Sequence, residues 1–173
     1  MEREEAKKRI AERFGAKVKV AERSPRRVYV YAENEIWTDL ARFLFNDLDA
    51  RFDTGAAVDD REGVEVMFFF PFDKEHYVVT IKTFAAKPNP TLNSITPFIP
   101  GAKWIEREMF EMYEVNFRNH PDLRPLLRAD TRPADYYPAK REVKDSHETV
   151  RDRDDGATRS DETAGRAPKG KNP

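Results

Sequence analysis

The stretch GVEVMFFFPFDKEHYVVTIKTFAAK (residues 63–87) contains the strongest strand pattern of this chain. Its first half alternates so that every second residue is large and apolar, and a short turn at residues 73–75 separates it from a second apolar run. β-Branched and aromatic residues with a period of two are typical of strands, so the stretch predicts an antiparallel pair. The side chains expected on its buried face are Val64, Val66, Phe68, Phe70 and Phe72. Met67 and Phe69 are apolar on the other face, which predicts that the middle of this strand is covered on both sides.

Segments before this stretch predict the elements that pack around it. Residues 2–15 have helical spacing, with Gly15 as a C-terminal stop. KVKV (17–20) and RRVYVYAE (26–33) predict two strands joined by a turn. EIWTDLARFLFNDL (35–48) predicts a second helix, and Asn34 precedes it as the expected cap. RFDTGAAVDD (51–60) is the weakest strand candidate.

The order of these elements predicts an α+β domain over residues 1–87, in which helices pack on a small, mostly antiparallel sheet. Residues 88–130 are expected to hold a proline-rich connector, a helix from about residue 101 to 115, and a loop with the sequence HPDLR. Residues 131–173 are expected to form an extended tail. Val143 and Val150 are the only sizeable apolar residues after Lys140, so residues 140–173 should be disordered without partners.

Composition excludes several kinds of site. The chain has 173 residues, no cysteine and a formal net charge of −1. No cysteine means no disulfide, no thiolate zinc site and no cysteine-ligated iron–sulfur cluster within this sequence. A near-zero net charge argues against non-specific nucleic-acid binding. There is no apolar run of membrane-spanning length, so we expect a cytosolic chain or one held at a membrane by partners. Absent glutamine and abundant Lys, Arg and Glu lean toward a thermophile.

The predicted helix near residues 101–115 has two faces. A charged stripe contains Lys103, Arg107, Glu111 and Glu114, and the opposite face, expected to pack on the domain, contains Ile105, Met109, Met112 and Tyr113. Trp104 and Phe110 flank the charged stripe, which suggests that a second surface covers this helix. Ordinary exposure of single aromatic residues is the alternative.

The loop after this helix is stiffened by Pro121 and Pro125, and a stiff loop loses little entropy when it docks. A catalytic role for the nearby groups is disfavoured because Glu106 and Glu108 point to different faces of the helix. His120 has no second histidine at metal-binding spacing, and the chain has no phosphate-binding glycine loop. The residues alone therefore favour a docking module over an enzyme.

WIEREMFEMYEVNFRNHPDLRPLL (residues 104–127) resembles the signature of the 30-kDa-type subunit of respiratory complex I. This subunit type also occurs in membrane-bound [NiFe] hydrogenases and formate hydrogenlyases. The family pattern is roughly E-R-E-x-x-D-M-F-G-I-x-F-x-x-H-P-D-L-R-R-I-L. Residues 106–108, Phe117 and residues 120–124 match it at unaltered spacing.

Four positions depart from that pattern. Glu111 replaces Asp, Tyr113 replaces Phe, and Pro125 replaces Arg. Glu114 replaces Gly, so a positive φ there is either no longer needed or adopted under strain. These changes suggest a divergent branch, and the compact, charged chain fits the hydrogenase-type branch of archaeal thermophiles.

The resemblance implies a non-catalytic subunit in the hydrophilic arm of a membrane-bound respiratory oxidoreductase, peripheral at the cytoplasmic face of the membrane. Its partners would be the hydrogenase-like large subunit (49-kDa type) and a small iron–sulfur subunit, in a complex that carries out electron transport and ion translocation. The chain would hold no cofactor, and the iron–sulfur clusters and any [NiFe] site would belong to partners. The expected interface residues are Glu106, Arg107, Glu108, Phe110, His120, Pro121, Asp122, Leu123 and Arg124.

Two alternatives stay open at this point. The same subunit type could serve an NADH/quinone- or sulfur-reducing complex. The rival from another class is a freestanding domain, either a binding domain for nucleic acid or another ligand, or an enzyme.

Overall fold

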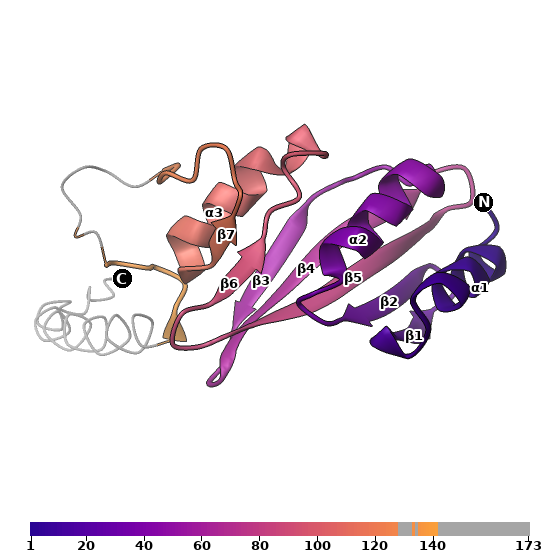
Figure 1. Cartoon of the computed structure of the whole chain (residues 1–173), viewed down its shortest axis with the longest axis horizontal. Coiled ribbons are helices and arrows are strands. Elements are labelled where there is room, and N and C mark those ends of the chain that lie inside the picture. The colour runs from indigo at the N-terminus through magenta and orange to yellow at the C-terminus, as the bar shows by residue number, and fades with distance from the viewer. Residues whose placement is uncertain (128–132, 134, 142–173) are drawn as a thin grey trace, which may run out of the picture.

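The computed structural model describes residues 1–127, 133 and 135–141, and the predicted α+β class is confirmed in them (Figure 1). A five-stranded sheet has the order β1-β2-β5-β4-β3, and a small parallel sheet pairs β6 with β7. The strands are β1 Val18–Ser24, β2 Arg27–Ala32, β3 Gly55–Asp59, β4 Gly63–Phe72, β5 Tyr77–Ala86, β6 Thr91–Asn93 and β7 Asn116–Arg118. The helices are α1 Arg3–Phe14, α2 Trp37–Arg42, extended by a π-helical turn at Phe43–Asp47, and α3 Lys103–Tyr113. Short 3₁₀ turns lie at Gly15–Lys17 and Pro100–Ala102.

The predicted meander of β3, β4 and β5 is confirmed. Both strand pairs are antiparallel, and Phe68 of β4 lies opposite Ile81 of β5. The five apolar residues predicted to share a face of β4 are at most 4% exposed. The pairing of β2 with β5 is parallel, which no local signal predicted, because the connection between them passes through α2, β3 and β4.

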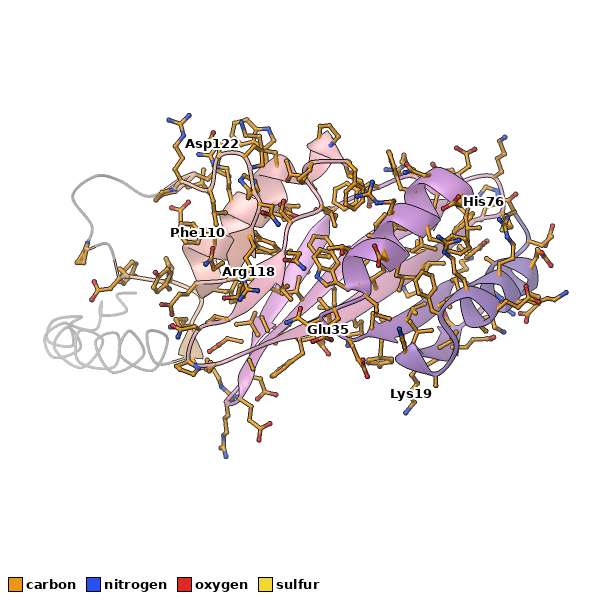
Figure 2. All side chains as sticks on the ribbon, in the orientation of Figure 1. Lys19, Glu35, His76, Phe110, Arg118 and Asp122 are labelled. Atoms are coloured by element: carbon orange, nitrogen blue, oxygen red, sulfur yellow. The ribbon has the colours of Figure 1, made fainter. Side chains whose placement is uncertain are left out.

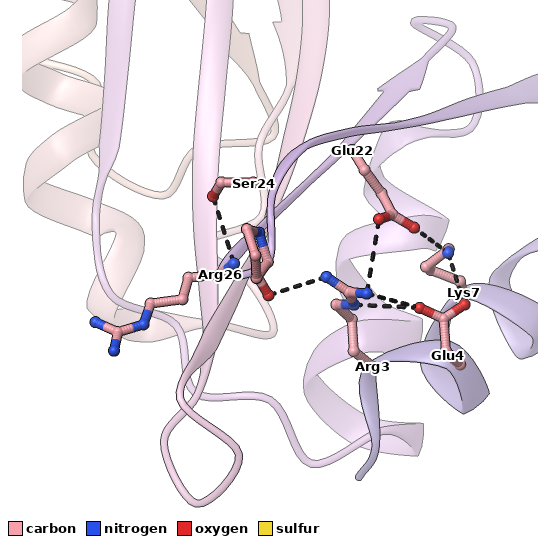
Figure 3. A network of polar contacts seen from close by, with 7 residues as sticks. Arg3, Glu4, Lys7, Glu22, Ser24 and Arg26 are labelled. Carbon is pink, nitrogen blue, oxygen red and sulfur yellow. Dashed lines mark hydrogen bonds and ion pairs between the residues drawn. The ribbon is translucent and has the colours of Figure 1, made fainter.

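Helix α1 is tied to the hairpin formed by β1 and β2. The guanidinium of Arg3 donates to the carbonyl oxygen of Pro25 at 3.0 Å and lies between Glu4 and Glu22 (Figure 3). Lys7 makes ion pairs with the same two carboxylates. Gly15 ends the helix with a φ of 56°, as its predicted role as a stop requires.

The start of α2 differs from the prediction. Asn34 does not cap the helix, because its side-chain nitrogen donates to the carbonyl oxygen of Thr91 at 3.2 Å. The helix begins at Trp37 instead, after a turn at residues 34–36. The Trp37 ring is fully buried and stacks on Phe68 with 5.0 Å between ring centroids, so packing decides where the helix begins.

The described helices cover one face of the large sheet. Helices α1 and α2 lie side by side in front of it in Figure 1, and α3 lies beside β3. Met67 and Phe69 point to the opposite face and are only half-buried. The covering expected on that second face is therefore not supplied by the described residues.

The proline-rich segment after β5 contributes to the core. Leu92, Ile95 and Ile99 are at most 2% exposed and belong to the same apolar cluster as the sheet residues. The proposed boundaries near residues 87 and 130 stay predictions, and the predicted disorder of residues 140–173 falls almost entirely outside the described residues. In the described part of the chain, no helix combines the length and the apolar character needed to cross a membrane.

Candidate partner-binding site

Helix α3 buries two of the four residues of the charged stripe that the sequence suggested would face outward. Arg107 is 6% exposed and Glu111 is 2% exposed, and Glu106 is fully buried. Met109 is buried on the domain side, as predicted. Other segments of the chain therefore cover α3 on two sides. The buried polar groups of the helix must find partners within the fold.

Glu106 is the centre of a buried polar cluster. Its carboxylate accepts hydrogen bonds from Oγ of Ser94 (2.5 Å), the N–H of Ile95 (2.8 Å) and Oγ1 of Thr96 (2.7 Å). Burial raises the pKa of Glu106 above its ordinary value, although these three donors act in the opposite direction. The carboxylate therefore anchors residues 94–96 to α3.

His120 is the next member of the same cluster, and its imidazole is completely buried. Nδ1 accepts from the N–H of Asp122 at 3.0 Å, and Nε2 lies 3.2 Å from the carbonyl oxygen of Lys103. A ring that accepts at Nδ1 carries its proton at Nε2, so the neutral tautomer satisfies both contacts. Burial lowers the pKa of His120, which favours this neutral form.

Arg107 and Glu111 hold the segment after the HPDLR loop. Arg107 donates from Nε to the carbonyl oxygen of Arg124 and from Nη2 to that of Pro125, at 2.9 and 2.8 Å. Glu111 accepts from the N–H groups of Leu126 and Leu127 at 2.6 and 2.7 Å. These are charge-assisted bonds to backbone, and they fix the path of residues 124–127 over α3.

Asp122 and Arg124 lie at the outer side of the loop. Asp122 makes ion pairs with Lys103 at 3.2 Å and with Nε of Arg124 at 2.9 Å. The hydrogen bond from Lys103 lowers the pKa of Asp122, with the nearby guanidinium of Arg124 acting in the same direction. The Arg124 side chain is 74% exposed, so it is available to a second molecule.

Large apolar side chains are exposed around this loop. Trp104 is 61% exposed, Leu127 is 71% exposed, and Phe110 is half-buried. The guanidinium of Arg107 lies 5.2 Å from the centre of the Trp104 ring, so Trp104 lies next to the side chain that holds residues 124 and 125. Figure 2 places Phe110 and Asp122 at the α3 end of the molecule. We call this area, made of Trp104, Phe110, Asp122, Arg124 and Leu127, the α3 surface.

The end of α3 carries the strain that the departure from the family pattern suggested. Glu114 has φ 65° and ψ 21°, a left-handed conformation that costs a residue with a side chain more than it costs glycine. Its carboxylate pairs with the amino group of Lys140. The N–H of Ala139 also donates to the carbonyl oxygen of Met112 at 3.0 Å, so residues 139 and 140 return to this helix end.

The nine interface residues predicted from the sequence thus divide into two groups. Glu106, Arg107 and His120 lie inside and position the loop, whereas Glu108, Phe110, Pro121, Asp122, Leu123 and Arg124 are exposed or half-buried. The roles of Ser94, Thr96, Glu111 and Leu127 were missed. A signal for Glu106 did exist, since it lies three residues before Met109 and so belongs to the inward face of the helix.

The polar groups of this cluster hold segments of the chain together. Each inner polar group binds backbone or hydroxyl groups of the same chain. Among residues 1–127, 133 and 135–141, no group of three or more His, Cys, Asp or Glu side chains is placed to hold a metal ion. What the arrangement offers to the outside is a stiff loop and large apolar side chains.

Comparisons with known proteins identify relatives of the chain. The profile of a family described as "Respiratory-chain NADH dehydrogenase, 30 Kd subunit" matches residues 30–149. An NADH-quinone oxidoreductase subunit of Chloroherpeton thalassium is 32% identical over 142 residues, which cover 78% of this chain and 58% of that protein. An F(420)H(2) dehydrogenase subunit of Methanosarcina mazei is 27% identical over 112 residues, covering 62% of this chain and 70% of the relative.

Two solved structures share the fold. A chain of the membrane-bound sulfane sulfur reductase, an archaeal respiratory membrane complex, superposes with a TM-score of 0.76 and 18% identity, covering 95% of this chain and 98% of that one. A trypsin-resistant fragment of Nqo5 superposes with a TM-score of 0.58 and 17% identity, covering 67% of this chain and 98% of the fragment. At these identities the likeness concerns the fold alone.

Proposed function

Because the chain belongs to the family of the 30 kDa subunit of respiratory-chain NADH dehydrogenase, we propose that it is a non-catalytic subunit of a membrane-bound oxidoreductase related to complex I. It sits in the hydrophilic arm, peripheral at the cytoplasmic face, and docks on the hydrogenase-like large subunit through the α3 surface. The family assignment and the geometry of this surface support the proposal.

The observation that carries the docking role is the exposure of Trp104 and Leu127 beside a loop that is rigidly held from within. Tryptophan and arginine are the residue types most enriched at interface hot spots. Arg107 and Glu111 fix the backbone of residues 124–127, which carries Arg124 and Leu127. The surface therefore loses little entropy when a partner binds. A loop of this kind is suited to a permanent interface.

The polar residues of the α3 surface can fix the orientation of the partner. Arg124 can offer its planar guanidinium to a partner carboxylate or carbonyl group in two parallel hydrogen bonds. In the free chain it has only the surface ion pair with Asp122, which is worth little in water. Exchange of this weak contact for a desolvated one favours assembly. The buried residues Glu106 and His120 act through the loop and do not meet the partner.

The partners that follow from this assignment carry the redox groups. The large subunit and a small iron–sulfur subunit hold the iron–sulfur clusters and, in a hydrogenase, the [NiFe] site. We place the chain in a membrane-bound [NiFe] hydrogenase of an archaeal thermophile, a complex that couples electron transfer to ion translocation. A sulfur-reducing complex is the second candidate, since a chain of one such complex shares the fold over 95% of this chain.

Purification of the native assembly tests this function. An affinity tag on this chain should recover a large subunit of the hydrogenase-like type and a small iron–sulfur subunit in equal amounts, as identified by mass spectrometry. Hydrogen evolution by the recovered complex would assign it to the hydrogenases, and reduction of sulfur compounds to the second candidate. Recovery of the chain alone, under conditions that keep membrane complexes intact, would favour the freestanding domain.

A further inference from the structure

The face of the large sheet that lies opposite α1 and α2 carries a second apolar surface. Tyr29, Tyr31, Met67 and Phe69 are half-buried there, and Phe84 is 41% exposed. None of these five side chains belongs to the main core cluster or packs against it. We call this area the open sheet face. It is separate from the α3 surface, since its residues come from β2, β4 and β5.

The strand register brings these residues together. Tyr31 lies opposite Lys82 of β5, and Lys82 lies opposite Met67 of β4, so the three form one row across the sheet. The amino group of Lys82 is 5.4 Å from the centre of the Tyr31 ring and 5.7 Å from that of Tyr29. It also pairs with Glu65 at 2.7 Å. Aromatic rings and one ion pair thus form the middle of the face.

Phe84 and Val58 continue the apolar area toward the edge of the sheet. Val58 of β3 lies opposite Glu65, and Glu65 lies opposite Phe84, so they form the neighbouring row. Val58 is 52% exposed. A side chain at Gly63 would come within 2.6 Å of the Phe84 ring, so the absence of one there leaves room for the ring next to Gly63. Two large apolar side chains remain open to solvent.

The face is hollowed and accessible. A shallow depression of about 560 Å³ lies over its centre and is lined by residues of β1, β2, β4 and β5. A second one of about 330 Å³ adjoins it near the start of β1. Tyrosine, methionine and arginine are enriched at protein interfaces, and all three types line the larger depression. Its shape and composition suit a helix laid across the strands.

The charges on this face are mainly positive. Among the residues that line the two depressions, Lys19, Arg27 and Lys82 stand beside the carboxylate of Glu65, and at the rim Lys17 and Glu33 offset each other. Lys19 and Arg27 are exposed, and Lys19 extends away from the ribbon at the lower edge of the view in Figure 2. A partner for this face therefore needs carboxylates around an apolar stripe.

We propose that the open sheet face binds an acidic, amphipathic helix of another protein subunit. Its apolar side chains would pack on Tyr29, Tyr31 and Met67, and its carboxylates would pair with Lys19 and Arg27. A second copy of this chain is disfavoured, because two such faces would repel each other. Residues 142–173 of the chain itself have too few large apolar residues to cover the rings.

Binding of designed peptides to the full chain tests the proposal. Two fluorescent peptides of about 18 residues, five helical turns, would carry the same leucine stripe, one with glutamates and the other with lysines on its flanks. Fluorescence anisotropy should show binding of the acidic peptide alone. The double variant Lys19→Glu/Arg27→Glu should weaken it about tenfold or more, and added salt should weaken wild-type binding in the same direction.

A matched control has the same change in net charge elsewhere. Lys8→Glu/Lys74→Glu alters exposed residues outside the face and should leave peptide binding unchanged. Equal binding of both peptides, or an equal loss in the two double variants, would overturn the proposal. Binding of anionic phosphatidylserine vesicles through Lys19 and Arg27 without peptide binding would assign the face to a membrane instead. A wild-type dimer in sedimentation, lost when Tyr31→Glu is introduced, would assign it to a second copy and equally refute the helix.

Discussion

Nε2 of His120 lies 3.8 Å from Oε2 of Glu106, and both side chains are completely buried. The two residues belong to different parts of the chain, α3 and the HPDLR loop, and each binds backbone that the other does not reach. Together they join residues 94–96, α3 and the loop in one polar cluster. His120 in this cluster binds the amide of Asp122, so the cluster holds the part of the loop that belongs to the α3 surface.

The protonation of His120 should make stability depend on pH. Burial lowers its pKa below the ordinary value of 6.5, so below that pH the unfolded chain binds a proton that the folded chain resists. The stabilising contribution is complete above about pH 6.5 and is lost as the pH falls through the folded pKa. Denaturant unfolding of wild type and His120→Asn at about pH 7.5 and about pH 5.5 measures it. The difference in unfolding free energy between the two proteins should shrink at the lower pH, whereas a constant difference would exclude this role.

Glu106 should make stability depend on pH in the opposite direction. Burial raises its pKa above 4.5, so the folded chain keeps a proton that the unfolded chain releases, and stability from this group falls as the pH rises through its folded pKa. The comparison of wild type with His120→Asn cancels the part of this effect that is common to both proteins, because Glu106 is present in both.

Removal of the Glu106 carboxylate should be far more harmful than removal of its neighbour. Glu106→Ala leaves three buried donors without an acceptor, at a cost of about 3 kcal/mol or more. Glu108→Ala, on the same helix but exposed, should change stability by no more than about 0.5 kcal/mol. Urea denaturation of both variants gives the comparison. Similar losses would show that the cluster does not hold the fold.

The clamp made by Glu111 should be visible in hydrogen exchange. In wild type its carboxylate protects the amides of Leu126 and Leu127, and bonds to a charged acceptor are worth about 1.5–3 kcal/mol. Glu111→Ala should therefore speed exchange at these two amides by about tenfold or more, with Glu108→Ala as the control. Unchanged rates would mean that residues 124–127 are held by other contacts.

Glycine at position 114 should relieve backbone strain. The left-handed conformation costs a residue with a side chain about 1 kcal/mol. Glycine avoids this cost, but its greater conformational freedom in the unfolded chain offsets part of the gain. Because Glu114 also pairs with Lys140, the comparison belongs in a Lys140→Ala background. There, Glu114→Gly should raise the unfolding free energy by about 0.5–1 kcal/mol. A loss of stability would show that the Glu114 side chain has a further role.

The sequence predicted those elements whose signals are local. The alternation from Val64 to Phe72 identified β4 and its buried face, and Gly15 correctly marked the end of α1. The parallel pairing of β2 with β5 could not be predicted, because it joins segments separated by α2, β3 and β4. The predicted helix cap at Asn34 was wrong for a related reason. Its side chain donates a hydrogen bond to the carbonyl oxygen of Thr91, which is distant in the sequence.

For the candidate site, the sequence located the segment but not the roles within it. Charged residues of a helix are normally solvated, so Arg107 and Glu111 suggested an outward stripe. The structure buries them because residues 124–127 return over α3 and supply backbone partners. Such a return depends on the path of the chain after Pro121, which no periodic pattern records.

The affinity of this chain for the large subunit shows whether the α3 surface docks there. Trp104→Ala and Arg124→Ala change exposed side chains, so both should leave the melting temperature of the free chain almost unchanged. Arg26→Ala, exposed at the β1–β2 turn, is the control. If the α3 surface docks on the large subunit, each of the first two variants should raise the dissociation constant roughly 30-fold, about 2 kcal/mol, while Arg26→Ala has no effect. Wild-type affinity in both Trp104→Ala and Arg124→Ala would exclude docking through the α3 surface.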